Sequence, residues 1–470
     1  MPVINPAEII IAPNEMRREF GAQLVITNAY LTMLHFGKET IKRKIHQIID
    51  YDGPIMTDSG GYQILRYGTV DVSPDDIVRY QDLIEPDIAT ILDVPTGINA
   101  SKEFAAQTVR ITLERAKQAL KVRSNSKVLW CAPIQGGLFT DLVAESAREM
   151  GKLNYQIHAI GSPVELLNGY RYRELVDLVM AAKQNLPLQR PVHLFGAGHP
   201  AMMALAVAMG CDLFDSAAYV LFARGARYLT PEGTLHVDEL SYLPCECPVC
   251  ANGSPDKFKE GSEMDRIKLL ARHNLQVTFG ELRRIRQAIV EGRLWQHVQY
   301  RCRSHPRLLD AFKRFLEYKD LVERFDSVTK KSVFYYSGEE SVQRPEVLRH
   351  SNRFRERYTP PPLPTLAIVS LSERGHPELE DDSIHLIKLV PPFGVVPEEL
   401  EEMYPLSQSQ TLKELDNAQI LSVTVALTEY IRRHGNNYQK VILFNKRRQW
   451  GDHLEKACES IKEKLEIIQT

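Results

Sequence analysis

The sequence contains no long apolar run, and this absence excludes an integral membrane protein. Its longest apolar stretches are far shorter than the roughly 20 residues that a membrane helix needs. The first residues, Met-Pro-Val-Ile-Asn-Pro, lack the basic and apolar regions of a signal peptide. The sequence therefore predicts a protein that stays in the cytoplasm.

An excess of charge of one sign is also missing, as is any low-complexity tract. Lys and Arg number 58 and Asp and Glu number 60, so the formal net charge is -2. A nucleic-acid partner would therefore have to bind a local patch.

Hydrophobic residues make up 44% of the chain, as in folded globular proteins. Because 470 residues exceed one ordinary core, we expect one large domain and a smaller one.

Cysteine is scarce, and its distribution excludes a disulfide framework. Seven cysteines, an odd number, are spread unevenly over the chain. Three of them, Cys245, Cys247 and Cys250, lie in PCECPVC, and His273 follows in ARHNL. Thiolates and imidazoles in this spacing suit a tetrahedral zinc ion, and four protein ligands leave no open position for catalysis. We predict one structural zinc; the alternative is a chance cluster of cysteines.

What the sequence does contain is an alternation of short apolar runs with longer helical patterns, which is typical of parallel β/α units. Eight runs are recognised: Pro2–Ile4, Leu24–Thr27, Ile55–Thr57, Ala89–Leu92, Val128–Ile134, Gln156–Ile160, Val192–Phe195 and Asp212–Phe214. Eight such units predict an α/β fold of the (β/α)8 TIM-barrel type, with its active site at the C-terminal ends of the strands. We assign residues 1–335 to this catalytic barrel, with a zinc-binding subdomain around residues 240–300.

The rest of the chain is expected to hold a connecting segment and a smaller α/β domain. Residues 336–365 should connect the two domains, with the Pro-rich segment 355–366 as an extended linker. GELRRIRQAIVEG and HPRLLDAFKRFLEY, which precede it, are interpreted as helices. Within residues 366–470, LAIVSLS and KVILFN look like strands, and Asp452–Ile467 looks like a helix.

Two carboxylates stand at the ends of predicted barrel strands. Asp58 lies in TDSGGYQI and Asp215 in FDSAAY. Taken singly, such residues are also explained as turn residues, which are common in β/α loops. Taken together, two convergent carboxylates can carry out displacement at a sugar carbon, because one attacks the anomeric carbon while the other shuttles the proton. The pair therefore indicates glycosyl chemistry.

Further polar residues on the same rim indicate a pocket for a flat heterocycle. Asp93 in LDVPT, Gln135 in PIQGG and Gly161 in AIGS supply a carboxylate, a side-chain amide and a backbone amide. Such groups can read the edge of a base, and Tyr62 can offer an aromatic face. The set predicts a guanine pocket. Three histidines are interpreted as packing or hydrogen-bonding residues rather than ligands: His158, His193 and His199.

The order of these motifs resembles the tRNA-guanine transglycosylases, and specifically the archaeal form. The segments that carry the resemblance are DSGGYQ, LDVPT, PIQGG, AIGS, FGAGHP, FDSAAYVLFARGARYLT, CECPVC and LLARHNL. It extends nearly continuously from Met1 to about Tyr358. It implies an enzyme that exchanges guanine at position 15 of the tRNA D-arm for free 7-cyano-7-deazaguanine, in archaeosine biosynthesis.

The resemblance also implies a role for each site residue. Asp215 would be the nucleophile that holds tRNA covalently, and Asp58 the general acid and base. Ser59, Tyr62, Asp93, Gln135 and Gly161 would bind the base. Zinc, held by Cys245, Cys247, Cys250 and His273, would be the one cofactor. The family further implies a homodimer.

Some features depart from the archaeal pattern. Tyr62 stands where Phe is usual, and Gly61 stands where Ser is usual. The chain starts almost on the first barrel strand, without the family's preceding strands. The segment Leu389–Gln410 resembles an accessory region shared with archaeosine synthases. Since no RNA-binding PUA domain is recognised before the end of the chain, we expect a separately encoded tRNA-binding partner.

Three alternatives stay open. A paralogue that binds tRNA and acts later in the pathway would not need both Asp58 and Asp215. An exchange of the bacterial queuine type would act on an anticodon guanine instead. A zinc-bearing adaptor on a barrel scaffold would give no reason for Asp93, Gln135 and Gly161 to share one rim.

Overall fold

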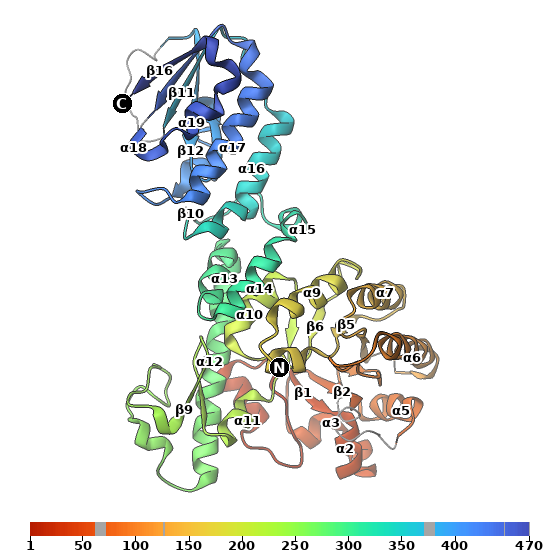
Figure 1. The fold of residues 1–470 in the computed structure, drawn as a ribbon. Helices are drawn as coiled ribbons and strands as arrows, with labels where there is room; N and C mark the ends of the chain where they lie inside the picture. Colours follow the sequence, from red (N-terminus) through yellow and green to blue (C-terminus); the bar gives the residue numbers. More distant parts are fainter. Residues whose placement is uncertain (62–71, 126, 371–380, 446, 470) are drawn as a thin grey trace. The chain divides into compact units, whose positions relative to one another are not determined.

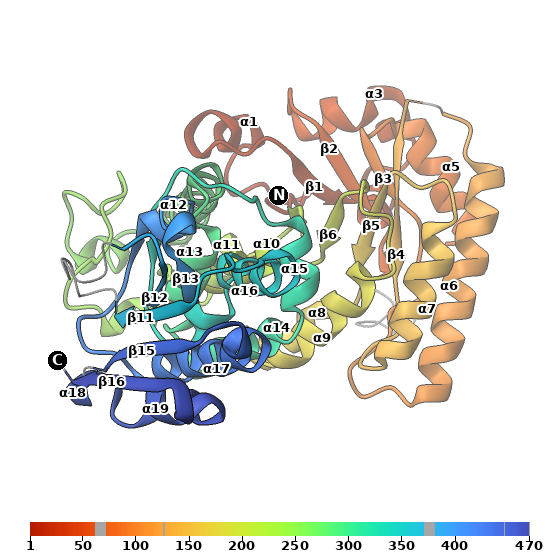
Figure 2. The ribbon, with the colours of Figure 1, turned by 90° about the horizontal axis from the view of Figure 1, so that it is seen from above.

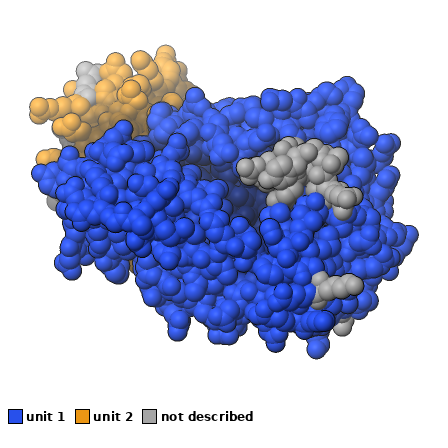
Figure 3. Space-filling view, turned by 90° about the horizontal axis from the view of Figure 1, so that it is seen from below, with its two compact units in different colours: residues 1–288, 297–315 blue, residues 289–296, 316–470 orange. Residues whose placement is uncertain are grey.

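The computed structural model describes residues 1–470 apart from residues 62–71, 126, 371–380, 446 and 470. The chain divides into two compact units, which are distinguished in Figure 3: residues 1–288 with 297–315, and residues 289–296 with 316–470. The domain boundaries expected at residues 335 and 365 stay predictions. In the part of the chain that the structure describes, no helix combines the length and apolar character that a membrane span requires.

Unit 1 is built around a parallel β-barrel (Figures 1 and 2). Seven strands pair in sequence order: β1 (Val25–Asn28), β2 (Ile55–Asp58), β3 (Ile88–Thr90), β4 (Leu129–Ile134), β5 (Ile157–Ile160), β6 (Val192–Leu194) and β7 (Leu213–Phe214). The N-terminal segment joins the two edge strands, because Val3 N donates to Ser216 O (3.1 Å) and Ile4 N to Ile26 O (2.7 Å). All eight predicted runs thus take part in the barrel, although the first forms single bridges rather than a ladder. The predicted TIM-barrel fold is confirmed.

Helices follow the strands and cover the outside of the barrel. They are α2 (Ala29–Phe36), α3 (Lys38–Ile49), α5 (Pro74–Ile84), α6 (Lys102–Val122), α7 (Thr140–Gly151), α8 (Pro163–Asn168), α9 (Tyr172–Lys183), α10 (Pro200–Ala208) and α11 (Ala218–Arg224). Figures 1 and 2 show α5, α6 and α7 side by side on one flank. Serine caps begin two of them, since Ser73 Oγ accepts from Asp76 N and Ser101 Oγ from Phe104 N.

The barrel interior is filled by apolar side chains from successive strands. The cluster consists of Ile26, Met56, Ile88, Cys131, Ile157 and Ala159. Strands packed on both faces explain why the sequence shows continuous apolar runs instead of alternation. Because side chains fill the interior of such a barrel, its active site lies at the C-terminal ends of the strands.

After the barrel, unit 1 continues into a lobe that carries the cysteine cluster. An antiparallel hairpin of β8 (Arg227–Leu229) and β9 (Thr234–His236) precedes the long helix α12 (Glu263–Glu291). Helices α13 (Leu294–Cys302) and α14 (Pro306–Leu316) follow. The two amphipathic segments predicted as helices lie in α12 and α14, so that prediction is confirmed.

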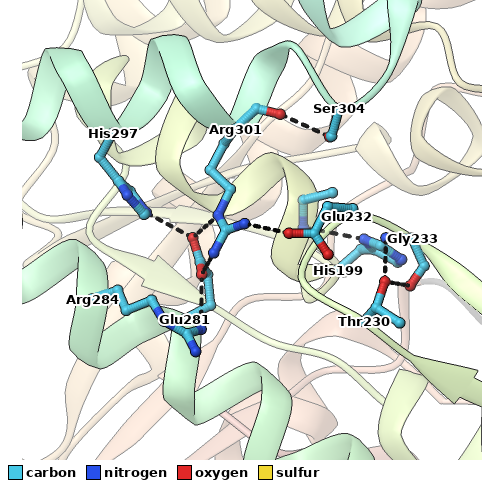
Figure 4. Close-up of polar contacts among 10 residues, drawn as sticks. His199, Thr230, Glu232, Gly233, Glu281, Arg284, His297, Arg301 and Ser304 are labelled. Atoms are coloured by element: carbon cyan, nitrogen blue, oxygen red, sulfur yellow. Dashed lines mark hydrogen bonds and ion pairs between the residues drawn. The ribbon is translucent and has the colours of Figure 1, made fainter. Parts of the chain in front are cut away.

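A buried ionic network ties α12 to α13 and to the turn between β8 and β9 (Figure 4). Glu281 is fully buried, and its carboxylate accepts from Arg301 Nη2 at 2.6 Å and from His297 Nε2 at 2.8 Å. Arg301 Nη1 also donates to Glu232, at 2.7 Å. Burial raises the pKa of Glu281, but His297 and Arg301 outweigh it and lower the pKa to about 2. Glu281 is therefore charged at the centre of this contact.

We expect Glu281→Gln to lower the free energy of unfolding by about 3–5 kcal/mol, because it removes the buried charge partner of Arg301 and leaves only the half-exposed Glu232. The matched control is Glu263→Gln on the same helix, where the side chain is 77% exposed and the stability should hardly change. Urea denaturation of both variants measures the difference. Equal midpoints for the two variants would show that the network does not stabilise unit 1.

Unit 2 contains a five-stranded sheet in the order β13-β12-β11-β15-β16. Its strands are β11 (Thr365–Ser370), β12 (Ile384–Val390), β13 (Gly394–Pro397), β15 (Lys440–Asn445) and β16 (Leu465–Gln469), and its helices include α15 (Lys319–Phe325), α16 (Pro345–Arg357), α17 (Asn417–His434), α18 (Arg447–Trp450) and α19 (His453–Ala457). Only β13 runs antiparallel to its neighbour. The described residues of this unit also form a short separate pair, β10 (Phe334–Tyr335) with β14 (Ser409–Gln410). The strands predicted from LAIVSLS and KVILFN are β11 and β15.

Two expectations for this unit are corrected. The final segment, expected as a helix over Asp452–Ile467, is helical only in α19 and in a 3-10 stretch over Glu459–Lys464, and then becomes strand β16. Its last residues pair with β15, and this tertiary pairing outweighs their local helical pattern. The Pro-rich linker is shorter than expected, because α16 continues to Arg357 and β11 begins at Thr365.

Candidate active site

Asp58 is the last residue of β2 and lies opposite Asn28 at the end of β1. Asn28 Nδ2 donates to Asp58 Oδ2 at 2.9 Å, while Asn28 Oδ1 accepts from Leu31 N and caps α2. Burial is the main cause that raises the pKa of Asp58. The charges of Asp93 and Asp215 raise it further, to about 7, against hydrogen bonds from the backbone of Gly60 and Ser59. Asp58 can therefore exchange a proton near neutral pH.

Asp215 follows β7, and its pKa shifts in the opposite direction to that of Asp58. His193 Nε2, on β6, lies 2.8 Å from Asp215 Oδ1, and Gly196 N donates to the same oxygen at 2.7 Å. Burial raises the pKa of Asp215, but the hydrogen bonds from His193 and from the backbone of Gly196 hold this pKa below its usual range. Asp215 is therefore ionised where Asp58 still holds its proton.

Asp93, Gln135 and Gly161 come together at the ends of β3, β4 and β5. Gln135 Nε2 donates to Asp93 Oδ2 at 2.5 Å, and both side chains are buried. Burial raises the pKa of Asp93 to about 6, against the hydrogen bond from Gln135. A Cβ atom on Gly161 would lie 2.3 Å from Gln135 Nε2, so only glycine allows this approach.

The backbone N–H of Gly161 has a partner within the barrel. It donates to Ile134 O at 2.9 Å, as part of the pairing between β4 and β5. The expected role of Gly161 in binding a base stays a prediction.

The loop after β2 brings the backbone against Asp93. Ser59 is buried, and its hydroxyl donates to Ile91 O at 2.9 Å, which anchors this loop to the chain beyond β3. A Cβ atom on Gly61 would lie 2.1 Å from Asp93 Oδ1, so a serine at this position would displace the carboxylate. Tyr62, the residue expected to stack on the base, lies outside the described residues.

Asn28 and His193 are the two residues of this site that sequence reasoning missed. Asn28 has the sequence context of a helix cap, and His193 was expected only to pack or to form hydrogen bonds. His193 does form a hydrogen bond, but its partner is Asp215. The other two histidines of that set form hydrogen bonds as expected: His158 contacts Arg190, and His199 caps α10. The sequence could have indicated both residues, because Asn28 and His193 lie on β1 and β6. These strands neighbour β2 and β7, which carry or precede Asp58 and Asp215.

The predicted metal ligands come together in the lobe after the barrel. The ligand atoms of Cys245, Cys247, Cys250 and His273 all lie within 4.8 Å of one another. His273 Nδ1 is 3.3 Å from Cys250 Sγ, and its other nitrogen, Nε2, lies 2.8 Å from Leu229 O. A hydrogen bond from Nε2–H to a carbonyl directs the lone pair of Nδ1 toward the thiols, as metal-ligating histidines require. These four residues fit a tetrahedral metal ion with no open position.

The fold and the site together define a (β/α)8-barrel enzyme with two carboxyl groups whose pKa values shift in opposite directions and with a lobe whose Cys3His cluster could hold a metal ion. A family model described as queuine tRNA-ribosyltransferase matches residues 1–307. The tRNA-guanine(15) transglycosylase of Thermococcus onnurineus is 43% identical over 437 residues, which are 92% of this chain and 71% of that protein. The protein of the same name from Haloferax volcanii is 44% identical over 409 residues, 87% of this chain and 78% of that protein. The chain belongs to the queuine tRNA-ribosyltransferase family of pentosyltransferases.

Proposed function

We propose that this chain is a tRNA-guanine(15) transglycosylase. It would replace guanine at position 15 of the tRNA D-arm by 7-cyano-7-deazaguanine, in archaeosine biosynthesis. The observation that carries the proposal is the pair of carboxyl groups after β2 and β7: Asn28 binds Asp58, whose pKa is raised to about 7, while His193 and Gly196 hold Asp215, whose pKa is lowered. Environments that separate two pKa values assign one group to attack and the other to proton transfer. The names of the archaeal relatives support the target position.

In the first step, Asp215 attacks C1′ of the ribose. The attacking atom is Oδ2, because Oδ1 is held by His193 and Gly196. The bond from C1′ to N9 breaks, its electron pair leaves with guanine, and protonated Asp58 supplies the proton that neutralises the departing base. The products are guanine, an aspartyl-ribose ester and ionised Asp58.

In the second step, ionised Asp58 takes the N9 proton of the incoming base. N9 then attacks C1′, and the ester bond to Asp215 breaks. Two inversions at one carbon retain the original configuration. Asp58 is protonated again and Asp215 is a free carboxylate, so the cycle needs no external acid, base or energy source.

Base recognition is assigned to the buried group at the ends of β3 to β5. Asp93 can accept from the N–H donors of a guanine edge, and the Gln135 amide has one N–H left beyond its bond to Asp93. The Gln135 carbonyl oxygen is already bound by Thr96 N at 2.9 Å, which fixes how the amide is oriented. The buried Ser59 would line the pocket, and Tyr62 would stack on the base.

The test is release of labelled guanine from a tRNA transcript that carries the label only at position 15. Adding unlabelled 7-cyano-7-deazaguanine should release the label in step with incorporation of the new base. Release from an anticodon position instead would favour the queuine-type alternative. Binding of tRNA without release of guanine from either position would favour a non-exchanging paralogue.

We further infer that the metal of the Cys245, Cys247, Cys250 and His273 cluster is zinc and that its role is structural. Three thiolates and one imidazole are the ligands of structural zinc sites. The ion would hold α12, through His273, to the cysteine segment between β9 and α12, while His273 also contacts Leu229 of β8 directly. A homodimer and a separate tRNA-binding partner stay predictions.

Cys250→Ala should remove the metal and lower the melting temperature by more than about 5 °C, because metal binding energy contributes directly to folding. Cys211→Ala is the matched control, since both cysteines are 3% exposed and only Cys250 belongs to the cluster. Elemental analysis should find one zinc per chain in the wild type and in the control. Full metal content in Cys250→Ala would contradict the assignment.

A further inference from the structure

We propose that His193 is a positioning residue for Asp215. Its neutral imidazole would donate to one oxygen of the carboxylate, fix the orientation of the group and leave the other oxygen free to attack. The inference rests on the proposed function, in which Asp215 is the nucleophile, and adds a residue that acts through it.

Two donors converge on the same oxygen of Asp215. His193 Nε2 lies 2.8 Å from Oδ1 and Gly196 N lies 2.7 Å from it, and among the described residues no hydrogen bond reaches Oδ2. Gly196 has a positive φ of 66°, which turns its N–H toward the carboxylate at a position that favours glycine. With Oδ1 held from two directions, the carboxylate cannot rotate and Oδ2 is defined as the reactive atom.

The surroundings of His193 specify its protonation state. The side chain is fully buried, and Nδ1 has no hydrogen-bond partner in the part of the chain that the structure describes. An imidazolium would carry a second N–H at Nδ1, buried without an acceptor, which is costly. Since a carboxylate can only accept, the single proton sits on Nε2. His193 is therefore a neutral donor.

Neutrality of the donor matters for the reaction. A buried cation beside Asp215 would oppose the positive charge that develops on the ribose in an oxocarbenium-like transition state. A neutral N–H orients the carboxylate without adding such a charge. The ring is itself held in place, because His193 is paired in β6 with both neighbouring strands and packs against Phe195, with 4.5 Å between ring centroids.

The test compares His193→Leu, which removes the donor, with His193→Gln, which can place an amide N–H near the position of Nε2. His193→Leu should lower kcat about 10- to 100-fold, the size expected for a hydrogen bond to a charged group. The KM for tRNA should hardly change, because the donor does not contact tRNA. The acid limb of the pH profile for adduct formation should move to higher pH, because this step needs ionised Asp215 and the variant removes one of its hydrogen-bond donors. His193→Gln should recover most of the rate and the original limb.

The outcomes separate this inference from the proposed function. An enzyme–tRNA adduct mapped to Asp215 in the wild type tests the proposed function by itself. With that adduct present, wild-type kcat and pH profile in His193→Leu would overturn the positioning role, as would equal losses in the Leu and Gln variants. If His193→Leu does not fold, as judged by the loss of a cooperative melting transition, His193→Phe is compared with His193→Gln instead.

Discussion

Asp215→Asn should abolish base exchange, with kcat lowered by about 10⁴-fold or more, while tRNA still binds. The amide keeps the shape of the side chain but cannot form the ester with C1′, so the covalent step is lost. The denaturation-resistant adduct with tRNA should be absent as well. Single-turnover guanine release and gel analysis of the adduct measure both effects.

Asp212→Asn is the matched control for this variant. Asp212 stands just before β7, at the end of the strand opposite Asp215, and its carboxylate accepts from Val192 N at 2.8 Å. An asparagine oxygen can still accept that bond, so kcat should stay near the wild-type value. An adduct that persists in Asp215→Asn, or that maps to Asp58, would contradict the assignment of the nucleophile.

Asp58→Asn should lower the rate of guanine release by about 10²- to 10⁴-fold, the usual contribution of a general acid or base. The wild type should also show a characteristic pH dependence. Asp58 must be protonated for the first step, so adduct formation should slow as the pH rises through about 7, the pKa that burial and the charges of Asp93 and Asp215 give this group. The second step needs ionised Asp58, so discharge of the adduct should slow as the pH falls. Its midpoint should lie below that of the first step, because the ester removes the Asp215 charge that helps to raise the pKa of Asp58.

Adduct formation without added base isolates the first step. Its limb near pH 7 should vanish in Asp58→Asn and persist in Asp52→Asn, where an exposed carboxyl shortly before β2 is changed. A limb that is unchanged in Asp58→Asn would assign the titration to another group, with Asp93 the next candidate because its pKa is raised to about 6.

The spacing of residues along the chain was sufficient for the barrel and for the metal ligands. Apolar runs mark the strands because parallel strands are buried on both faces. The carboxylates of the candidate site could be located as well, because residues at the C-terminal strand ends of a barrel gather on one rim. Cys245, Cys247 and Cys250 are close in sequence, and His273 follows on a helix, so local geometry nearly suffices to bring them together.

The spacing of residues did not predict structure or hydrogen bonds that depend on a partner distant in the sequence. Leu465–Gln469 forms a strand because β15 is available to pair with it, and no local pattern records that neighbour. The amide of Gly161 is occupied by Ile134 for a similar reason. The side chains of Asn28 and His193 look ordinary in sequence, and only the pairing of β1 with β2 and of β6 with β7 brings them to Asp58 and Asp215.

The sequence by itself thus determined which residues gather on the rim and which four can hold a metal. Only the tertiary structure decided how the two carboxyl groups differ. Asp58 and Asp215 are the same chemical group at equivalent strand ends, and local sequence gives no reason for one to hold its proton near pH 7 while the other stays ionised. That difference arises from burial, from neighbouring charges and from hydrogen-bond donors on other strands, because a pKa depends on distances in space.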